Sequence, residues 1–221
     1  VSCIERFAQP TQRCPYCAQT LSTDVCENCQ DTPSALDTCL TAVSYGFPWD
    51  TCMARFKFRA DTGLARQLAH LMQHAPHVEP ALEAAHQVVA MPLSASRLRE
   101  RGFNQAYELA KQLSPHKATS TTLLRSGDGA HQVGASREER QTLVQHVFWI
   151  APEAIASLKN QHVVLVDDVM TSGATLAAAA ESCLAAGASS DRCRPRPARP
   201  PHNAAIATRP WRGRPASGSR S

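Results

Sequence analysis

The segment VVLVDDVMTSGATL, residues 163–176, restricts the fold of this chain more than any other segment does. Its first four residues are apolar, which is typical of a central parallel strand that is buried on both faces. Two adjacent carboxylates, Asp167 and Asp168, follow this run. In open α/β sheets, ligands bind beyond the carboxyl ends of the strands. The segment therefore predicts an α/β fold with a binding site at these two residues.

The rest of the chain alternates short apolar runs with helical patterns. The run HQVVAM at residues 86–91 stops at Pro92 and predicts a buried strand followed by a loop. Residues 36–47 are typical of a strand and a turn, and the spacing of apolar residues predicts helices at 64–72 and 103–113. Strands that alternate with helices favour a mostly parallel sheet flanked by helices.

Three further stretches complete this interpretation. Residues 114–136 are polar and rich in Gly, Ser and Thr, and they predict a mobile connection. A short helix is expected at 136–145, with Ser136 as its N-cap. The helix after residue 173 is expected to present one apolar face made of Leu176, Ala180, Cys183 and Leu184.

The residues around the two carboxylates predict a particular kind of ligand. Adjacent carboxylates repel each other, so a metal ion or the hydroxyl groups of a ligand should offset their charge. The following backbone N–H groups can surround an anion at the positive end of a helix dipole, and glycine permits close approach. The candidate anion-binding residues are Thr171, Ser172, Gly173, Ala174 and Thr175. Carboxylates for sugar hydroxyls and a nest for phosphate together describe a site for a ribose 5-phosphate.

Two segments resemble a known family. VVLVDDVMTSGAT (163–175) resembles the phosphoribosyl pyrophosphate (PRPP) signature of type I phosphoribosyltransferases, although an ordinary strand–turn–helix with a solvated Asp pair is the alternative. MPLSASRLRERGFNQAYELAKQL (91–113) resembles the region after the first core strand in the ComF family of competence proteins, and its RGFNQ is the most specific part. With these matches, the chain is identified as resembling the ComF family, which implies a type I phosphoribosyltransferase fold.

Looser matches extend the resemblance to about residues 10–188. FKFRAD (56–61) is similar to the Lys-centred segment of the family, and HQVGASREERQTLVQHVF (131–148) is similar to its Gln…Arg…Phe segment. The chain departs from the family where Ser94-Ala95-Ser96 replaces a usual His or similar polar residue, and where Leu143 replaces a usual Asn.

The resemblance implies binding of PRPP together with Mg2+. Asp167 and Asp168 would hold the ribose hydroxyls, and the residues after them would hold the 5-phosphate. Arg97, Arg99 and Arg101 could hold pyrophosphate, but an Arg-rich loop is usually a solvated face, and we expect one or two of them to touch ligand. The acceptor of the phosphoribosyl group is unknown.

Four of the nine cysteines form two C-x-x-C pairs, Cys14 with Cys17 and Cys26 with Cys29. Each pair makes a knuckle, and four thiolates close a tetrahedral structural Zn2+ site. Members of the ComF family often carry such an N-terminal zinc finger. Redox-active cysteines or loose thiols are the alternative. The scattered cysteines are interpreted as small core or surface residues: Cys3, Cys39, Cys52 and Cys183.

The composition changes at about residue 189. Residues 191–221 hold eight Arg, six Pro and one Asp, which gives this segment a net charge of +7. The first 190 residues have a net charge of −3. This composition predicts a disordered tail without a core strand. Because the family normally continues into another strand here, we interpret the tail as a frameshift or truncation. The expected domains are a zinc-finger module (1–35), a phosphoribosyltransferase-like domain (36–188) and the tail (189–221).

Two functions follow as hypotheses. The first is a phosphoribosyltransferase associated with DNA uptake. The second is a non-enzymatic accessory of transformation that binds single-stranded DNA and keeps the nucleotide site as a sensor or relic. The finger (14–29) contains no Lys or Arg and one aromatic residue, Tyr16, so it offers few contacts to single strands. No apolar run approaches the ~18 residues that cross a bilayer, and we expect a cytoplasmic protein that meets the competence machinery there.

Overall fold

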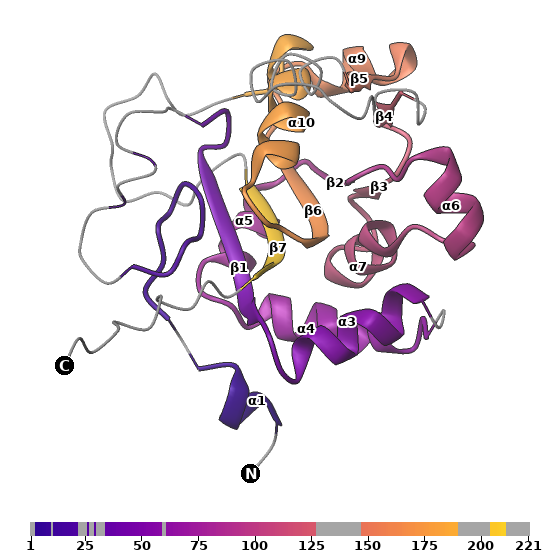
Figure 1. Cartoon of the computed structure of the whole chain (residues 1–221). Helices are drawn as coiled ribbons and strands as arrows, with labels where there is room; N and C mark the ends of the chain where they lie inside the picture. The colour runs from indigo at the N-terminus through magenta and orange to yellow at the C-terminus, as the bar shows by residue number, and fades with distance from the viewer. Residues whose placement is uncertain are drawn as a thin grey trace, which may run out of the picture.

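The chain is described by a computed structural model (Figure 1), which covers residues 3–9, 11–21, 26, 29, 34–58, 61–126, 147–189 and 204–210. For Cys3 and residues 204–210 only the backbone is described. The helices are α1 (Cys3–Phe7), α3 (Trp49–Phe58), α4 (Leu64–Gln73), α5 (Val78–Ala84), α6 (Ala95–Arg101), α7 (Gln105–Leu113), the 3-10 helix η2 (Pro152–Ala154), α9 (Ile155–Leu158) and α10 (Ala174–Ala185). The strands are β1 (Thr38–Tyr45), β2 (Gln87–Ala90), β3 (Ala118–Thr119), β4 (Leu123–Arg125), β5 (Phe148–Ile150), β6 (Val163–Val169) and β7 (Ala204–Pro210).

Five of the strands form one parallel sheet, in the order β1-β7-β6-β2-β3. Its centre is β6, which pairs with β2 on one side, where Val88 lies opposite Val164, and with β7 on the other. The four apolar residues 163–166 are all buried. This confirms the predicted α/β fold with a parallel sheet and places the end of β6 inside the sheet rather than at its edge.

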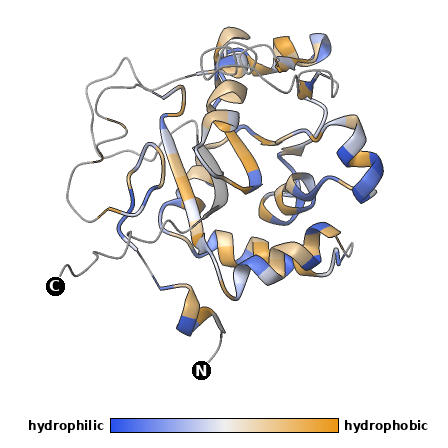
Figure 2. Cartoon of the chain, in the orientation of Figure 1, coloured by the Kyte–Doolittle hydropathy of each residue, from blue (hydrophilic) through white to orange (hydrophobic). Residues whose placement is uncertain are grey.

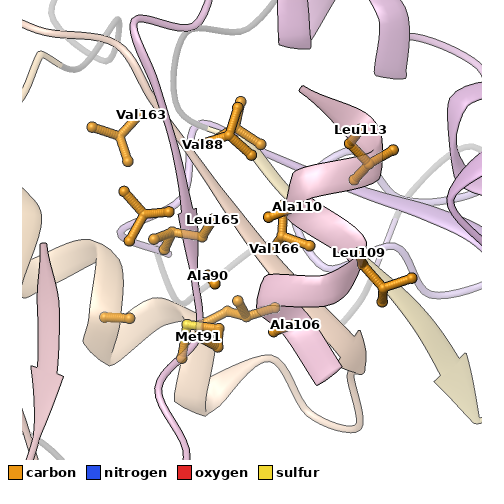
Figure 3. Packing of buried hydrophobic residues seen from close by; sticks show 14 of the residues in the cluster. Val88, Ala90, Met91, Ala106, Leu109, Ala110, Leu113, Val163, Leu165 and Val166 are labelled. Carbon is orange, nitrogen blue, oxygen red and sulfur yellow. The ribbon is translucent and has the colours of Figure 1, made fainter. Parts of the chain in front are cut away.

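Apolar side chains of β2, β6 and α7 gather in the main core (Figure 3). Helix α7 contributes Ala106, Leu109, Ala110 and Leu113, and it packs against β2, β6 and α4. In α10, Leu176, Ala180 and Cys183 are buried and Leu184 is half-buried, as the predicted apolar face requires. The predicted helices at 64–72 and 103–113 correspond to α4 and α7, and the predicted strands correspond to β1 and β2.

Strand β7 corrects one expectation. The prediction that residues 189–221 supply no core strand is wrong for residues 204–210, which pair in parallel with both β1 and β6. The high Arg and Pro content of the tail as a whole conceals its short apolar run, AAIA. Ladder hydrogen bonds from two neighbouring strands stabilise a short segment that its own composition would not.

The connection after α7 is also more ordered than predicted. Within 114–136, the structure forms the edge strand β3 and then β4, which pairs antiparallel with β5. Lys117 anchors this stretch by donating hydrogen bonds to the carbonyl oxygens of Leu82 and Glu83, at 2.9 and 3.0 Å. Leu123 is fully buried. The predicted helix at 136–145 and most of the segment 131–148 lie outside the described residues.

Candidate functional site

The two carboxylates lie at the carboxyl end of β6 and differ in their surroundings. Asp167 is half-buried, whereas Asp168 is buried. The Oδ1 atom of Asp167 accepts a hydrogen bond from the backbone N–H of Asp168 at 2.8 Å. The pair is therefore held in a defined arrangement by the strand itself, before any ligand is present.

Lys57 places a positive charge next to Asp168. Its Nζ lies 3.1 Å from Oδ1 of Asp168, and the side chains are only 16% and 11% exposed. Lys57 lies in the last turn of α3, so an element far away in the sequence offsets one of the two negative charges. Sequence reasoning had noted the segment 56–61 but had assigned no partner to this lysine. Only the docking of α3 beside β6 shows the pair.

The electrostatics of Asp167 are unusual. Burial, followed by the negative charge of Asp168, raises the pKa of Asp167 from 3.8 to about 8. The backbone N–H of Asp168 and the charge of Lys57 lower the pKa, but these effects are smaller. A carboxyl group whose pKa is raised in this way is easily deprotonated by a ligand or a cation that offers it positive charge or hydroxyl donors.

The loop between β6 and α10 contains the predicted anion-binding residues. Thr171, Ser172, Ala174 and Thr175 are exposed, and Gly173 adopts the left-handed conformation with φ of 83°. The Oγ of Ser172 accepts a hydrogen bond from the N–H of Ala174 at 3.3 Å. Gly173 is the N-cap of α10, a helix of 12 residues. The exposed loop thus leads into the positive end of a helix dipole, directly after the carboxylates.

The three candidate arginines lie in or at the end of α6, but they are not equivalent. The loop before α6 starts beside the carboxylates, because the N–H of Met91 donates to the carbonyl of Val166 at 2.9 Å. No residue of α6 itself is buried, and Figure 2 shows it as largely hydrophilic. Arg97 and Arg99 are exposed. Arg101 is half-buried and donates through Nη1 to Oε1 of Gln105 at 2.9 Å.

The RGFNQ segment has a structural role that its residue types alone did not show. Asn104 caps α7 by accepting from the N–H of Tyr107 at 3.2 Å, and its Nδ2 donates to the carbonyl of Met91 at 3.1 Å. Phe103 packs against Phe56, with ring centroids 5.6 Å apart. The segment therefore ties the end of β2 to α7 and to the helix that carries Lys57.

Arg101, Phe58 and Gln105 form a contact beside this segment. The guanidinium of Arg101 lies over the ring of Phe58, 5.6 Å from its centroid, and Phe58 is 67% exposed. Gln105 is fully buried, and among the described residues neither its Nε2 nor the Nε of Arg101 has a hydrogen-bond partner. Sequence reasoning did not single out Phe58 or Gln105, and the signal that could have found Gln105 is its place four residues after Arg101 at the start of a helix.

The four cysteines predicted to bind zinc come together. The sulfur atoms of Cys14, Cys17, Cys26 and Cys29 all lie within 4.8 Å of one another, and those of Cys17 and Cys26 are 3.7 Å apart. The N–H of Tyr16 donates to the sulfur of Cys14 at 3.4 Å, which orients that ligand. Four cysteine sulfurs at this separation fit a closed tetrahedral Zn2+ site.

Two thiols of this cluster, those of Cys17 and Cys29, favour their protonated form. Burial raises the pKa of Cys17 and that of Cys29. A bound Zn2+ would replace these protons, so its affinity is expected to fall as the solution becomes acidic. The other cysteines behave as predicted where they are described: Cys39 and Cys183 are buried and Cys52 is half-buried.

Comparisons with known proteins agree with this arrangement. The family described as phosphoribosyl transferase domain matches residues 98–192. The chain is 28% identical over 184 residues to the DNA utilization protein YhgH of Escherichia coli K12, which covers 79% of each chain. It is 28% identical over 200 residues to the competence protein ComFC of Bacillus subtilis, covering 84% of this chain and 78% of the relative. It is 29% identical over 177 residues to competence protein F of Haemophilus influenzae, covering 74% of each.

The matched residues include the second half of α6, the RGFNQ segment, β6 and the loop before α10, but not Arg97. They do not include the cysteine cluster or Lys57. Within the described part of the chain, every helix is too short or too polar to span a lipid bilayer.

Proposed function

We propose that this chain, a relative of the competence protein F proteins that carries a phosphoribosyl transferase domain, binds PRPP together with Mg2+ at the carboxyl end of β6. The observation that carries the proposal is the direct succession of two carboxylates, a left-handed glycine and a helix N-terminus at the end of a central parallel strand. This is where open parallel sheets bind nucleotides and sugar phosphates.

Each group would meet the part of PRPP that its chemistry suits. The carboxylates of Asp167 and Asp168 would accept hydrogen bonds from the ribose hydroxyls. The N–H groups and hydroxyls of the exposed loop 171–175 would hold the 5-phosphate at the positive end of α10. Arg101 is the arginine best placed for pyrophosphate, because Gln105 and Phe58 already hold its guanidinium. Arg97 and Arg99 are exposed and would attract the negatively charged pyrophosphate from solution.

Mg2+ would enter with the substrate. This ion prefers oxygen ligands, keeps several waters and usually binds through substrate phosphates and one or two carboxylates. Asp167 is the carboxylate suited to this, since Asp168 is already paired with Lys57. The positive charge of the ion would neutralise the phosphates that the protein has to bind.

The protein residues support transfer of the phosphoribosyl group to an acceptor that is not identified. Breaking the bond between ribose C1 and pyrophosphate forms a cationic sugar, so the protein needs to position the substrate and stabilise charge rather than supply a nucleophile. The adjacent carboxylates of β6 place negative charge where the sugar would sit. The acceptor would be chosen by residues around this centre.

Calorimetric titration of PRPP and Mg2+ into the zinc-loaded protein tests the proposal. We expect saturable binding that the Asp167→Asn/Asp168→Asn variant loses. The matched control is Glu181→Gln, which removes an exposed carboxylate from α10 away from the carboxyl end of β6 and should bind as the wild type does. Equal binding by the double variant and the control would place PRPP elsewhere, and absence of binding by the folded wild type would refute the site.

A second candidate function is binding of single-stranded DNA, and one surface favours it. We define the α6 surface as Arg97, Leu98, Arg99, Arg101 and Phe58. Leu98 is 46% exposed and Phe58 is 67% exposed, beside three arginines. Exposed aromatic rings next to positive charges are what sequence-tolerant single-strand binding uses. This surface, rather than the cysteine module, is where we would seek such binding.

The test compares two variants for binding of a fluorescent oligonucleotide over a range of salt concentrations. Arg97→Ala/Arg99→Ala/Phe58→Ala should weaken binding and reduce its salt dependence if the α6 surface is used. A chain ending after Pro210 removes tail arginines and keeps β7. Binding lost only in the shortened chain would assign it to nonspecific attraction by the tail.

The role in DNA uptake rests on what the relatives are called: one is a DNA utilization protein and two are competence proteins. We propose that this chain acts in the cytoplasm beside the competence machinery. A host strain whose own copy is deleted should regain transformation with the wild-type chain. Failure of the Asp167→Asn/Asp168→Asn variant to restore it would link the role to the nucleotide site, whereas full restoration would favour the accessory function.

A further inference from the structure

The carbonyl group of Pro15 joins the cysteine module to the start of β1, and Arg13 donates a further hydrogen bond to Ser44 near the end of that strand at 2.8 Å. The carbonyl oxygen of Pro15, which lies between the ligand residues Cys14 and Cys17, accepts the backbone N–H of Cys39 at 2.6 Å. The same oxygen accepts the hydroxyl of Thr38 at 2.9 Å. The first knuckle is therefore in direct contact with the first residues of β1, Thr38 and Cys39.

Cys39 in turn contacts Met170, a residue far away in the sequence. Its thiol donates a weak hydrogen bond to the Sδ of Met170, with the two sulfur atoms 3.2 Å apart. Both side chains are buried, Cys39 at 3% and Met170 at 2% exposure. In a close-packed interior, a change in the position of one of these side chains is felt by the other.

Met170 is the last buried residue before the exposed loop. It lies two residues after Asp168, and its Sδ lies 3.6 Å from the point where a Cβ on Gly173 would be. Gly173 is the left-handed N-cap of α10, so Met170 supports the turn that aims the N–H groups of the loop. Hydrogen bonds thus connect Pro15 through Cys39 to Met170, whose side chain lies beside the turn at Gly173.

We propose that Cys39 and Met170 are positioning residues that couple metal binding in the cysteine module to the order of the loop 171–173. Four bound cysteines hold the first knuckle, the knuckle holds Cys39, and Cys39 holds Met170 under the loop. The effect on PRPP affinity rests on the proposed function, whereas the effect on loop order does not. Because coupling between two binding sites is reciprocal, PRPP should raise the affinity for zinc by the factor by which zinc raises the affinity for PRPP.

The first experiment compares zinc-loaded protein with protein stripped by a chelator and returned to Mg2+ buffer. We expect backbone amide exchange at 170–175 to accelerate on stripping and the dissociation constant of PRPP to rise about fivefold or more. Unchanged exchange at 170–175, with the module visibly loosened, would overturn the proposal. If the wild type never binds PRPP but its loop responds to zinc, the proposed function fails and the coupling stands.

The second experiment keeps zinc bound and removes the side-chain link. Cys39→Ala preserves the backbone bond to Pro15 but loses the sulfur contact, and Met170→Ala loses the support of the turn. Both should accelerate exchange at 170–175 while the module stays protected, and Met170→Leu should restore most of the protection. Cys183→Ala is the matched control, because it removes an equally buried thiol that lies outside this series of contacts.

The combination of both experiments distinguishes coupling from loss of stability. In Cys39→Ala, stripping zinc should no longer change exchange at 170–175, because the link is already cut. An equal response to zinc in Cys39→Ala and in the wild type would show that the sulfur contact carries no coupling. If the stripped wild type unfolds entirely, the zinc-loaded variants decide the question alone. Met170→Ala then has to show faster amide exchange at 170–175 than Cys183→Ala does.

Discussion

The cysteine cluster and the carboxylate centre hold polar groups together in opposite ways. The four cysteines come from a short stretch of 16 residues, 14–29, in which the structure describes little regular secondary structure. The carboxylate centre joins Asp168 of β6 with Lys57 of α3, two elements far apart in the sequence. We therefore expect the cluster to depend on a bound metal ion, whereas the sheet and its helices hold Asp168 and Lys57 together in advance.

This difference concerns where the stabilising free energy comes from. Small metal modules bury too little apolar surface to fold without their ion. The carboxylate centre instead stands on β6, whose apolar residues pack in the main core (Figure 3). We expect damage to the sheet to destroy the carboxylate centre, and loss of metal to leave the sheet folded and to affect only the module and the coupled loop 171–173. The following predictions test this, from the largest effect to the smallest.

Ala205→Pro tests whether the sheet needs β7. Ala205 lies opposite Cys39 of β1 and Leu165 of β6. Proline cannot donate to the ladder and is excluded from central strands, so we expect a loss of roughly 3 kcal/mol or more in the free energy of unfolding. Thermal unfolding followed by circular dichroism measures it. A chain ending after Pro210 is the control, and a wild-type midpoint in Ala205→Pro would restore the expectation that the tail supplies no core strand.

Removal of zinc should separate the two regions. In Cys26→Ser, we expect the module to lose its metal and its protection from amide exchange, while helices α4 and α7 and the part of α10 after residue 175 keep theirs. Hydrogen exchange with peptide resolution and zinc content by mass spectrometry are the measurements. Cys52→Ser, which changes a cysteine outside the cluster, should keep one zinc per chain. Global unfolding of Cys26→Ser would contradict the independence of the sheet.

Lys57→Met tests the balance of charge at the carboxylate centre. The variant leaves Asp168 largely buried without its cation, and we expect a loss on the order of 3 kcal/mol in the free energy of unfolding at neutral pH. Lys57→Arg should recover part of it. Arg55 lies on the same helix as Lys57, and Arg55→Met breaks its more exposed pair with Asp61. This change should cost at most about 1 kcal/mol in the free energy of unfolding. Equal effects of Lys57→Met and Arg55→Met, measured in urea, would show that burial adds nothing to the first pair.

Asp167→Asn tests the raised pKa by its effect on pH dependence. Because the pKa is about 8 in the folded protein and 3.8 ordinarily, the folded protein holds a proton that the unfolded chain releases across this window. This contribution to stability is complete below pH 3.8 and is lost as the pH rises through about 8. The wild type without ligand should therefore lose more stability than Asp167→Asn between these pH values. The measurement is the midpoint of thermal unfolding as a function of pH between 3.8 and about 8, with Asp61→Asn as the control. Parallel curves for the wild type and Asp167→Asn would refute the raised pKa.

Much of this fold and site could be predicted because the signals are local. The apolar run before Asp167 predicts a buried strand, and Gly173 after it predicts a turn into a helix, so both could be found by reading along the chain. The spacing of Cys14, Cys17, Cys26 and Cys29 predicts one metal site for the same reason. Assignments of ligands to these residues remain predictions.

The errors arose where a segment depends on its neighbours in space. The run AAIA in the tail is too short to predict a strand against its Arg/Pro-rich background, yet β1 and β6 both pair with it. The polar stretch after α7 becomes ordered because Lys117 and the buried Leu123 attach it to the body of the protein. Neither set of partners can be read from the segment itself.

The sequence by itself determined the central strand, its two carboxylates, the glycine turn and the cluster of four thiols, because periodicity, backbone conformation and short spacing are properties of a local stretch. Only the tertiary structure decided that Lys57 pairs with Asp168, that Gln105 holds Arg101, and that Cys39 touches Met170. Those contacts arise because burial of apolar surface drives distant elements together, and the polar groups that they carry then have to be paired with one another.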